Sequence, residues 1–246
     1  GRKDINNIIS LNSVKELKFI KKKNSNIEVG ATTSLIEFES FIKEYYPDFN
    51  VILKRYGSVQ IRNVGTIAGN IATASPIGDT LPLLLSLDAK VVLQKVSKKT
   101  ILPLKNFFIS YRKTKLKKGQ FIHSIIIPIF KNNVFKAYKI SKRIDDDISS
   151  VCASFNLEIN NKKIKNIKIA YGGMAPIPKR ATNCEKTLIN SILSEESFKK
   201  AKKMLEKDFN PINDMRATKD YRMEVAKNLL MKCFLEIKKN KLIRLN

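Results

Sequence analysis

The stretch Arg62-Asn-Val-Gly-Thr-Ile-Ala-Gly-Asn-Ile-Ala-Thr-Ala-Ser-Pro-Ile-Gly-Asp79 decides how the rest of the chain is interpreted. Its glycines, Gly65, Gly69 and Gly78, lie among small, hydroxyl and amide side chains. Because such a run has little bulk, its backbone can approach a large flat ligand, and glycine leaves room where a Cβ would stand. Short polar groups that can form hydrogen bonds come from Thr66, Asn70, Thr73, Ser75 and Asp79. The sequence predicts a ligand-binding bend between positions 65 and 79, with an ordinary irregular loop as the alternative.

Two familiar nucleotide-binding signatures are absent from the chain. There is no G-x-x-x-x-G-K followed by Ser or Thr, and Gly65 and Gly69 lack the third glycine of the Rossmann fingerprint. Their G-x-x-x-G spacing also occurs in membrane helices, but Asn70, Pro76 and Asp79 exclude a lipid-facing helix. A nucleotide bound here would therefore be held by a different fold.

The chain is strongly basic, with Lys+Arg 47 against Asp+Glu 22 and a formal net charge of +25 over 246 residues. This length allows one or two domains with a real core. The lysines are spread along the whole chain and are seldom interleaved with aromatic residues, a pattern typical of a solvated surface. A basic nucleic-acid-binding module remains the alternative from a different class of function.

Cysteine and histidine usage limits the chemistry of this chain. Cys152, Cys184 and Cys233 lie far apart without C-x-x-C spacing, and His123 is the single histidine. Neither a zinc site, an iron–sulfur cluster nor a histidine-based triad can be built from these residues alone. The odd cysteine number and the absence of a signal-like N-terminus indicate a cytoplasmic setting, and no apolar run is long enough to span a membrane. Because the sequence opens on strand-like residues without a start methionine, we expect a fragment of a longer polypeptide.

The first half of the chain is expected to combine short strands with short helices. Ser34 followed by Glu37 predicts a capping box, and apolar residues at helical spacing continue that helix to Pro47. The other predicted elements of this half are helices at 49–56 and 80–87 and strands at 4–10, 27–31, 90–94 and 100–102.

The second half is expected to form an antiparallel meander followed by helices. Strands are predicted at 121–127, 134–140, 149–159 and 164–171, with a hairpin turn at 160–161, and helices at 195–206 and 221–237. Met223, Ala226, Leu230, Cys233 and Ile237 recur at 3-4-3-4 spacing, which predicts a core face. The fold class is α+β, with helices on one face of this sheet, and a boundary at 131–133 divides the chain into domains 1–130 and 131–246.

A charged segment joins two of these strands. Lys142 and Arg143 are followed by three consecutive acids, Asp145 to Asp147. One interpretation is a solvated hairpin tip. The other is an electrostatic rim around a charged cofactor, with Lys139 or Arg143 near developing negative charge.

Together these segments resemble the flavoprotein part of molybdenum hydroxylases, most closely the small, FAD-binding subunit of bacterial xanthine dehydrogenase. The resemblance is carried, in the family's order, by residues 60–79, 108–113, 142–148, 171–175 and 220–222. It implies a two-lobed FAD-binding domain of the vanillyl-alcohol-oxidase (PCMH-like) type, of which the second lobe is present. A C-terminal domain like that of the carbon monoxide dehydrogenase flavoprotein, with an antiparallel sheet and helices, is implied to follow.

The resemblance also implies the cofactor-binding residues. Tyr56 corresponds to an aromatic residue near the isoalloxazine, Asp79 to an acid at the sugar or adenine side, and Ile122 to a position whose backbone touches the flavin. Lys139 corresponds to a base beside the ring, and 143–147 to a charged loop where NAD approaches. The residues implied to hold the phosphate and ribityl region, or to lie near it, are Gly65, Thr66, Ile67, Ala68, Gly69, Asn70, Thr73 and Ser75.

The activity implied is electron relay during hypoxanthine or xanthine oxidation. Electrons pass from a molybdenum cofactor through 2Fe–2S clusters, both on a partner subunit or a segment outside this sequence, to FAD and then to NAD. The implied partners are a molybdenum-cofactor-binding large subunit and an iron–sulfur domain, and Lys139 and Arg143 are expected to tune the flavin potential. Flavoproteins of carbon monoxide, nicotinate or aldehyde dehydrogenases remain alternatives, as does a scaffold without cofactor.

The family has an earlier glycine-rich segment that cradles the FAD pyrophosphate. This sequence begins just after the point where that segment would end. We therefore expect weak or absent FAD binding by the chain as printed.

Overall fold

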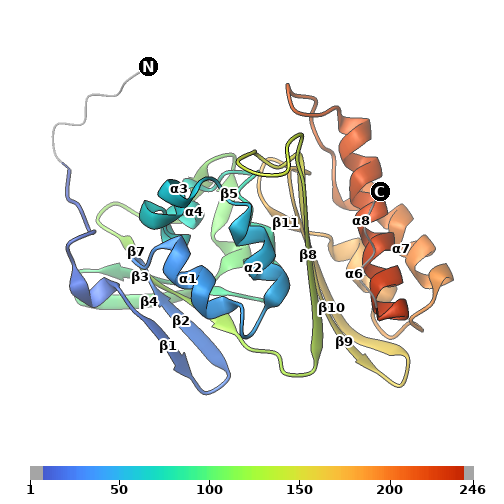
Figure 1. The fold of residues 1–246 in the computed structure, drawn as a ribbon, viewed down its shortest axis with the longest axis horizontal. Coiled ribbons are helices and arrows are strands. Elements are labelled where there is room, and N and C mark those ends of the chain that lie inside the picture. The colour runs from blue at the N-terminus through green and yellow to red at the C-terminus, as the bar shows by residue number, and fades with distance from the viewer. Residues whose placement is uncertain (1–7, 241–246) are drawn as a thin grey trace.

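The computed structural model describes residues 8–240 of the chain, and the strands within them form two main antiparallel sheets (Figure 1). In the first sheet β7 lies between β2 and β3, so the strand latest in the sequence occupies the centre. The order of this sheet is β1 (Ile20–Lys23), β2 (Asn26–Gly30), β7 (Phe121–Pro128), β3 (Lys90–Lys95) and β4 (Lys98–Pro103). The strands predicted at 90–94 and 100–102 are confirmed, and they pair with each other.

Five short helices connect β2 to β3. They are α1 (Leu35–Ile42), α2 (Pro47–Lys54), α3 (Val59–Val64), α4 (Ile67–Thr73) and α5 (Thr80–Ser86). The capping box is confirmed, because Glu37 N–H donates to Ser34 Oγ and the Glu37 carboxylate accepts from Ser34 N–H. The first helix ends at Ile42 and not at Pro47. Pro47 instead takes the first position of α2, where its missing N–H costs no intrahelical hydrogen bond.

The second sheet has the order β11 (Lys179–Arg180), β10 (Lys163–Gly172), β9 (Val151–Asn160) and β8 (Asn133–Ile140). The meander prediction is confirmed for β8 to β10, and Asn161 and Lys162 form the hairpin turn with φ of 48° and 60°. The prediction is wrong for β7, which pairs with β2 and β3. Ile125 and Ile127 of β7 face the core of the first sheet, which fixes that strand there.

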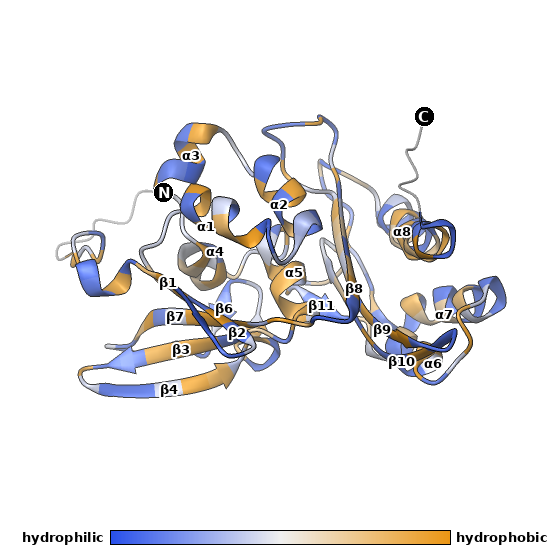
Figure 2. Ribbon diagram, turned by 60° about the horizontal axis from the view of Figure 1, so that its bottom comes forward, coloured by the Kyte–Doolittle hydropathy of each residue, from blue (hydrophilic) through white to orange (hydrophobic). Residues whose placement is uncertain are grey.

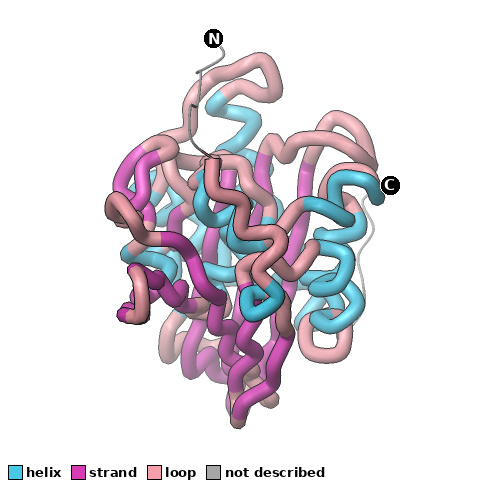
Figure 3. Tube along the Cα trace, turned by 90° about the vertical axis from the view of Figure 1, so that its left-hand side faces the viewer, coloured by secondary structure: helices cyan, strands magenta, loops and turns pink. Residues whose placement is uncertain are grey.

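Helices cover both faces of the second sheet (Figure 2). Figure 3 shows the molecule from the side of the first sheet, with most strands (magenta) converging toward the bottom of the view. On one face lie α6 (Thr182–Leu188), α7 (Glu195–Asp208) and α8 (Lys219–Lys239), and the predicted stripe of α8 packs in this core. On the other face lie α2 and α5. The expectation of helices on a single face is therefore wrong. A strand covered on both faces has no solvent-facing side chains, and β9 is accordingly buried without interruption from Val151 to Leu157.

Helix α5 joins the two sheets, and all of its residues are buried. Its apolar side chains belong to the first core, which also contains Ala137, Cys152 and Ala170 from the second sheet. Its polar contact with β9 is satisfied, because the hydroxyls of Ser86 and Ser154 are hydrogen-bonded at 2.6 Å. The end of α5 is therefore held against the second sheet.

Two further expectations concern the ends and the membrane. Of the strand predicted at 4–10, residues 4–7 lie outside the described residues and residues 8–10 have no regular structure. None of the helices in residues 8–240 is long and apolar enough to cross a membrane. Short elements complete the fold: η1 (Lys15–Leu17), η2 (Leu104–Asn106), β5 (Phe108–Ser110) and β6 (Lys113–Thr114).

Candidate flavin site

A cavity of about 690 Å³ opens where α3, α4 and the start of α5 meet the loop between β8 and β9. Its size lies within the range of about 300–1,000 Å³ that is usual for ligand pockets. Both halves of the chain line it, with Leu35, Tyr56, Gly57, Ile61, Gly65, Thr66, Gly69, Asn70, Thr73, Ser75, Pro76, Ile77, Gly78, Asp79, Tyr111 and Arg112 from the first and Lys139, Asp146, Asp147, Ile148 and Arg216 from the second. The small-residue stretch therefore lines an open cavity.

The stretch is not an irregular bend, because much of it is the helix α4. Thr66 caps this helix by accepting a hydrogen bond from Gly69 N–H at 2.9 Å, and Ala74 ends it with a φ of 47°. Ile67 and Ala68 are buried in the first core and do not line the cavity. The helix thus turns its small polar face to the cavity and its apolar face to the core.

The three glycines of the stretch have different physical roles. A Cβ on Gly65 would lie 2.9 Å from the carbonyl oxygen of Ile61, and one on Gly78 would lie 3.1 Å from the side chain of Asn70. At Gly69 a Cβ would meet only the hydroxyl of Thr66, at 3.1 Å. Gly65 and Gly78 therefore allow close packing of the protein itself, whereas Gly69 leaves open cavity space that a side chain would occupy.

Asn70 holds the aromatic side chain at the cavity wall. Its Nδ2 donates to the Tyr56 hydroxyl at 3.0 Å, and its Oδ1 accepts from Thr80 Oγ1 at 2.5 Å. Burial, and secondarily the charge of Asp79, raises the pKa of Tyr56, so this phenol stays protonated at neutral pH. Nearby, Thr73 donates to the Gly69 carbonyl at 2.8 Å.

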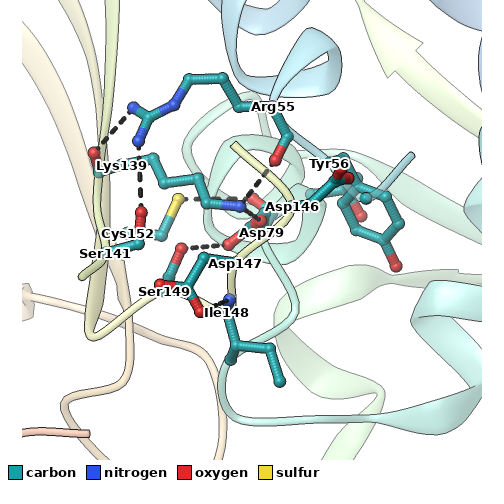
Figure 4. Close-up of polar contacts among 12 residues, drawn as sticks. Arg55, Tyr56, Asp79, Lys139, Ser141, Asp146, Asp147, Ile148, Ser149 and Cys152 are labelled. Atoms are coloured by element: carbon teal, nitrogen blue, oxygen red, sulfur yellow. Dashed lines mark hydrogen bonds and ion pairs between the residues drawn. The ribbon is translucent and has the colours of Figure 1, made fainter. Parts of the chain in front are cut away.

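A buried ion pair lines the cavity, and its contacts are shown in Figure 4. Lys139 Nζ lies 2.7 Å from Asp79 Oδ2 and also donates to the Arg55 carbonyl at 2.9 Å. Ser149 Oγ donates to the other carboxylate oxygen of Asp79. The side chains of Lys139 and Asp79 are only 1% and 6% exposed, so their charges neutralise each other inside the protein.

The charged loop that follows Lys139 is tied to α2. The Arg55 guanidinium donates to the carbonyls of Lys139 at 3.0 Å and Ile144 at 2.8 Å, and to Ser141 Oγ at 3.2 Å. The Arg143 side chain is 73% exposed and does not line the cavity, although its Nη2 donates at 3.1 Å to the carbonyl of Asp146, which does. The Arg143 N–H donates to the Asp147 carboxylate at 2.8 Å, and this hydrogen bond lowers the pKa of Asp147.

Several lining residues were not predicted from the sequence. Tyr111 and Arg112 lie within the segment 108–113 that supports the resemblance, but no pattern marked them as cavity residues. Arg216 lies in the loop between α7 and α8, which carries no motif. Conversely, Ile122, which the resemblance implies near the flavin, is 5% exposed in the first core and does not line the cavity.

The lining residues fit a flavin nucleotide. Tyr56 and Tyr111 provide aromatic surface, and apolar side chains such as Ile61 complete a wall suited to a ring system. Arg112 and Arg216 provide guanidinium groups of the kind that bind phosphate. Because Gly69 has no side chain, the ligand can approach the backbone of α4 closely at this point.

The chain's own sulfur and carboxylate groups do not assemble a metal site within residues 8–240, where no group of three or more metal-ligating side chains occurs. All three cysteines are buried free thiols. Burial raises the pKa of Cys152 well above its usual range, so its thiol stays protonated.

Comparisons with known proteins point to one family over nearly the whole chain. The family model described as the FAD binding domain in molybdopterin dehydrogenase matches residues 1–130, and that of the CO dehydrogenase flavoprotein C-terminal domain matches residues 136–237. Glyceraldehyde dehydrogenase medium chain from Sulfolobus acidocaldarius is 30% identical over 94% of this chain and 82% of its own length. Xanthine dehydrogenase from Emericella nidulans is 32% identical over 82% of this chain, which spans only 16% of that protein.

Solved structures show the same fold. Quinoline 2-oxidoreductase from Pseudomonas putida 86 matches with a TM-score of 0.84 and 20% identity, over 95% of this chain and 82% of the other. Carbon monoxide dehydrogenase from Hydrogenophaga pseudoflava matches with a TM-score of 0.83 and 24% identity, over 88% and 76%. The chain therefore belongs to the FAD-binding flavoprotein family of the molybdenum hydroxylases, and its cofactor is FAD.

Proposed function

We propose that this chain is the flavin subunit of a xanthine dehydrogenase, which relays electrons from iron–sulfur clusters through FAD to NAD. The observation that carries the proposal is the cavity of about 690 Å³, lined by the small-residue stretch from one side and by the 146–148 loop from the other. We place this cavity between two domains, 1–130 and 131–246. A molybdenum-cofactor-binding subunit and an iron–sulfur domain would be the partners.

FAD, when bound, supplies the redox chemistry, and the protein supplies position and electrostatics. We assign the contacts to the predicted residues that line the cavity: Tyr56, Gly65, Thr66, Gly69, Asn70, Thr73, Ser75, Asp79 and Lys139. Ile67 and Ala68 can contribute only backbone groups, because their side chains lie in the core. Ile122 would need contact through a neighbour, since it does not line the cavity.

The geometry gives little support to tuning of the flavin potential by Lys139 or Arg143. The charge of Lys139 is balanced by Asp79 at 2.7 Å. Arg143 is largely exposed, where solvent and salt screen its charge. We expect the cations at the cavity, Arg112 and Arg216, to contribute more to binding of an anionic nucleotide.

NAD as the acceptor can be tested on the FAD-loaded protein without its partners. Anaerobic addition of NADH is expected to bleach the visible absorbance of the bound flavin. Flavin that stays oxidised under excess NADH, yet is bleached by dithionite, would refute NAD as the acceptor.

A second candidate is the flavin subunit of an aldehyde-oxidising enzyme. It is favoured by the glyceraldehyde dehydrogenase medium chain, whose length this chain covers to 82%. The two candidates differ in a subunit that this chain does not include, so the complex purified with its partners must be assayed. Turnover of hypoxanthine supports the first proposal, and turnover of glyceraldehyde without hypoxanthine oxidation supports the second.

A further inference from the structure

Arg222 of α8 is among the largest fully buried side chains of the described residues, with 1% exposure. Its guanidinium reaches three separate segments of the chain. Nη1 donates to the carbonyls of Ser150 and, at 3.2 Å, Gly173, while Nη2 donates to Asp214 Oδ1 at 2.6 Å. A planar guanidinium can serve three acceptors at fixed angles, which a lysine ammonium cannot match.

Each of these three segments contacts or closely adjoins a residue of the cavity wall. Ser150 lies two residues after Ile148, which lines the cavity. Gly173 N–H donates to the Pro76 carbonyl at 2.8 Å, and Pro76 lines the cavity. Asp214 accepts the N–H of Arg216 at 2.8 Å, and Arg216 also lines the cavity.

The contacts around the guanidinium are close and specific. A Cβ on Gly173 would lie 3.0 Å from Arg222 Nη1 and 2.2 Å from the Ser150 carbonyl oxygen, so this approach requires glycine. Burial tends to raise the pKa of Asp214, but the N–H groups of Arg216 and Ala217 and the Arg222 guanidinium outweigh it and lower that pKa. Asp214 is therefore a charged partner at neutral pH.

We propose that Arg222 is a positioning residue for the flavin cavity, which fixes three of its wall segments through one buried guanidinium. Arg222 has no place among the lining residues of that cavity and acts on it only through Ser150, Gly173 and Asp214. The proposal rests on the proposed function, because it takes this cavity as the FAD site.

A purely structural role is the competing explanation, and Arg180 provides a matched control. Arg180 lies in the same half of the chain and binds Glu185 at 2.7 Å and Asp88 at 3.1 Å, with a side chain 17% exposed. It does not line the cavity. Substitution by lysine keeps the charge at either position and removes the forked hydrogen bonds.

The first test needs no FAD. Hydrogen–deuterium exchange of the full chain is expected to rise about tenfold in segments 141–150, 173–178 and 211–217 of Arg222→Lys and in none of them in Arg180→Lys. Equal effects of both variants on these segments, or no effect of Arg222→Lys, would overturn the proposal. If Arg222→Lys does not fold, Asp214→Asn serves instead, with faster exchange expected in 211–217 alone.

The second test measures the consequence for the cofactor. The Kd for FAD, from quenching of flavin fluorescence, is expected to rise on the order of tenfold in Arg222→Lys, as for other residues that orient a ligand-binding group. The visible circular dichroism of the bound flavin should change in that variant and stay unchanged in Arg180→Lys. An unchanged Kd and spectrum in Arg222→Lys would refute the inference, whereas FAD binding that Thr73→Trp leaves unchanged would refute the assigned FAD site and leave the exchange result standing.

Discussion

Replacing Lys139 with methionine would leave the Asp79 carboxylate buried without its cation. The two side chains are 1% and 6% exposed and lie 2.7 Å apart, so solvent cannot take over the role of the ammonium. Removing one partner of a buried pair typically costs about 3–5 kcal/mol. For a chain of this size that corresponds to a fall in Tm of about 6–20 °C, at about 2–4 °C per kcal/mol.

The assay is a thermal melt followed by circular dichroism, run as a double-mutant cycle with Asp79→Asn. The double variant should recover much of the loss of either single variant, because it leaves no unpaired charge. The control is Lys199→Met, whose partner Glu195 forms an exposed pair on α7 with side chains 65% and 54% exposed. That change should cost at most about 0.5 kcal/mol. A Tm of Lys139→Met within 2 °C (about the scale of 1 kcal/mol or less) of the wild type, or strictly additive effects in the cycle, would refute the argument.

Three smaller predictions follow from single contacts. Burial, and secondarily Lys99, whose Nζ lies 2.8 Å from His123 Nε2, lowers the pKa of His123. Lys99→Met should therefore raise this pKa, which an NMR titration of the single histidine would show, and an unmoved titration would contradict the reasoning. Because the pKa in the folded state lies below the unfolded value of about 6.5, the His123 contribution to stability falls as the pH drops below about 6.5. Ser34→Ala removes the cap of α1 and should cost about 1 kcal/mol in thermal unfolding, whereas an unchanged Tm would show that the cap is dispensable. Gly173→Ala places a Cβ 2.2 Å from the Ser150 carbonyl oxygen at a φ of 82° and should lower the Tm more than Ser34→Ala does; an equal or smaller fall would argue against that tight approach.

The regular elements with strong local signals were predictable from the sequence. The capping box at Ser34 and Glu37 set the start of α1, and the apolar stripe of α8 set its buried face. Both signals arise within one or two helical turns, so they need no knowledge of distant segments.

Helices α3, α4 and α6 were missed because their signals are weak or distant. Helix α3 has six residues, none of them buried, so it has no apolar stripe to mark it. The end of α4 is Ala74 in the left-handed region, where sequence analysis expects glycine or asparagine. At the start of α6 no neighbouring side chain caps the helix. Instead the carboxylate of Asp208 accepts the N–H groups of Asn183 and Cys184 from 24 or more residues away.

The cavity was predictable in its first wall and not in its second. Small residues marked the 65–79 stretch directly, whereas Arg216 and Ile148 reach the cavity only through tertiary contacts. The pairing of Asp79 with Lys139 joins residues 60 positions apart. Charges that cancel across such a distance cannot be recognised along a sequence, so both residues were predicted to act on the cofactor individually.

The binding of FAD in the cavity beside α4 is the claim on which the account depends. It is tested most directly by FAD titration of the purified protein, followed by flavin fluorescence up to high FAD concentration. Thr73→Trp would fill the cavity from α4, and Ala72→Trp places the same bulk on the exposed neighbouring position that does not line it. The account predicts saturable binding by the wild type and by Ala72→Trp and its loss in Thr73→Trp; saturable binding that Thr73→Trp leaves unchanged would contradict it.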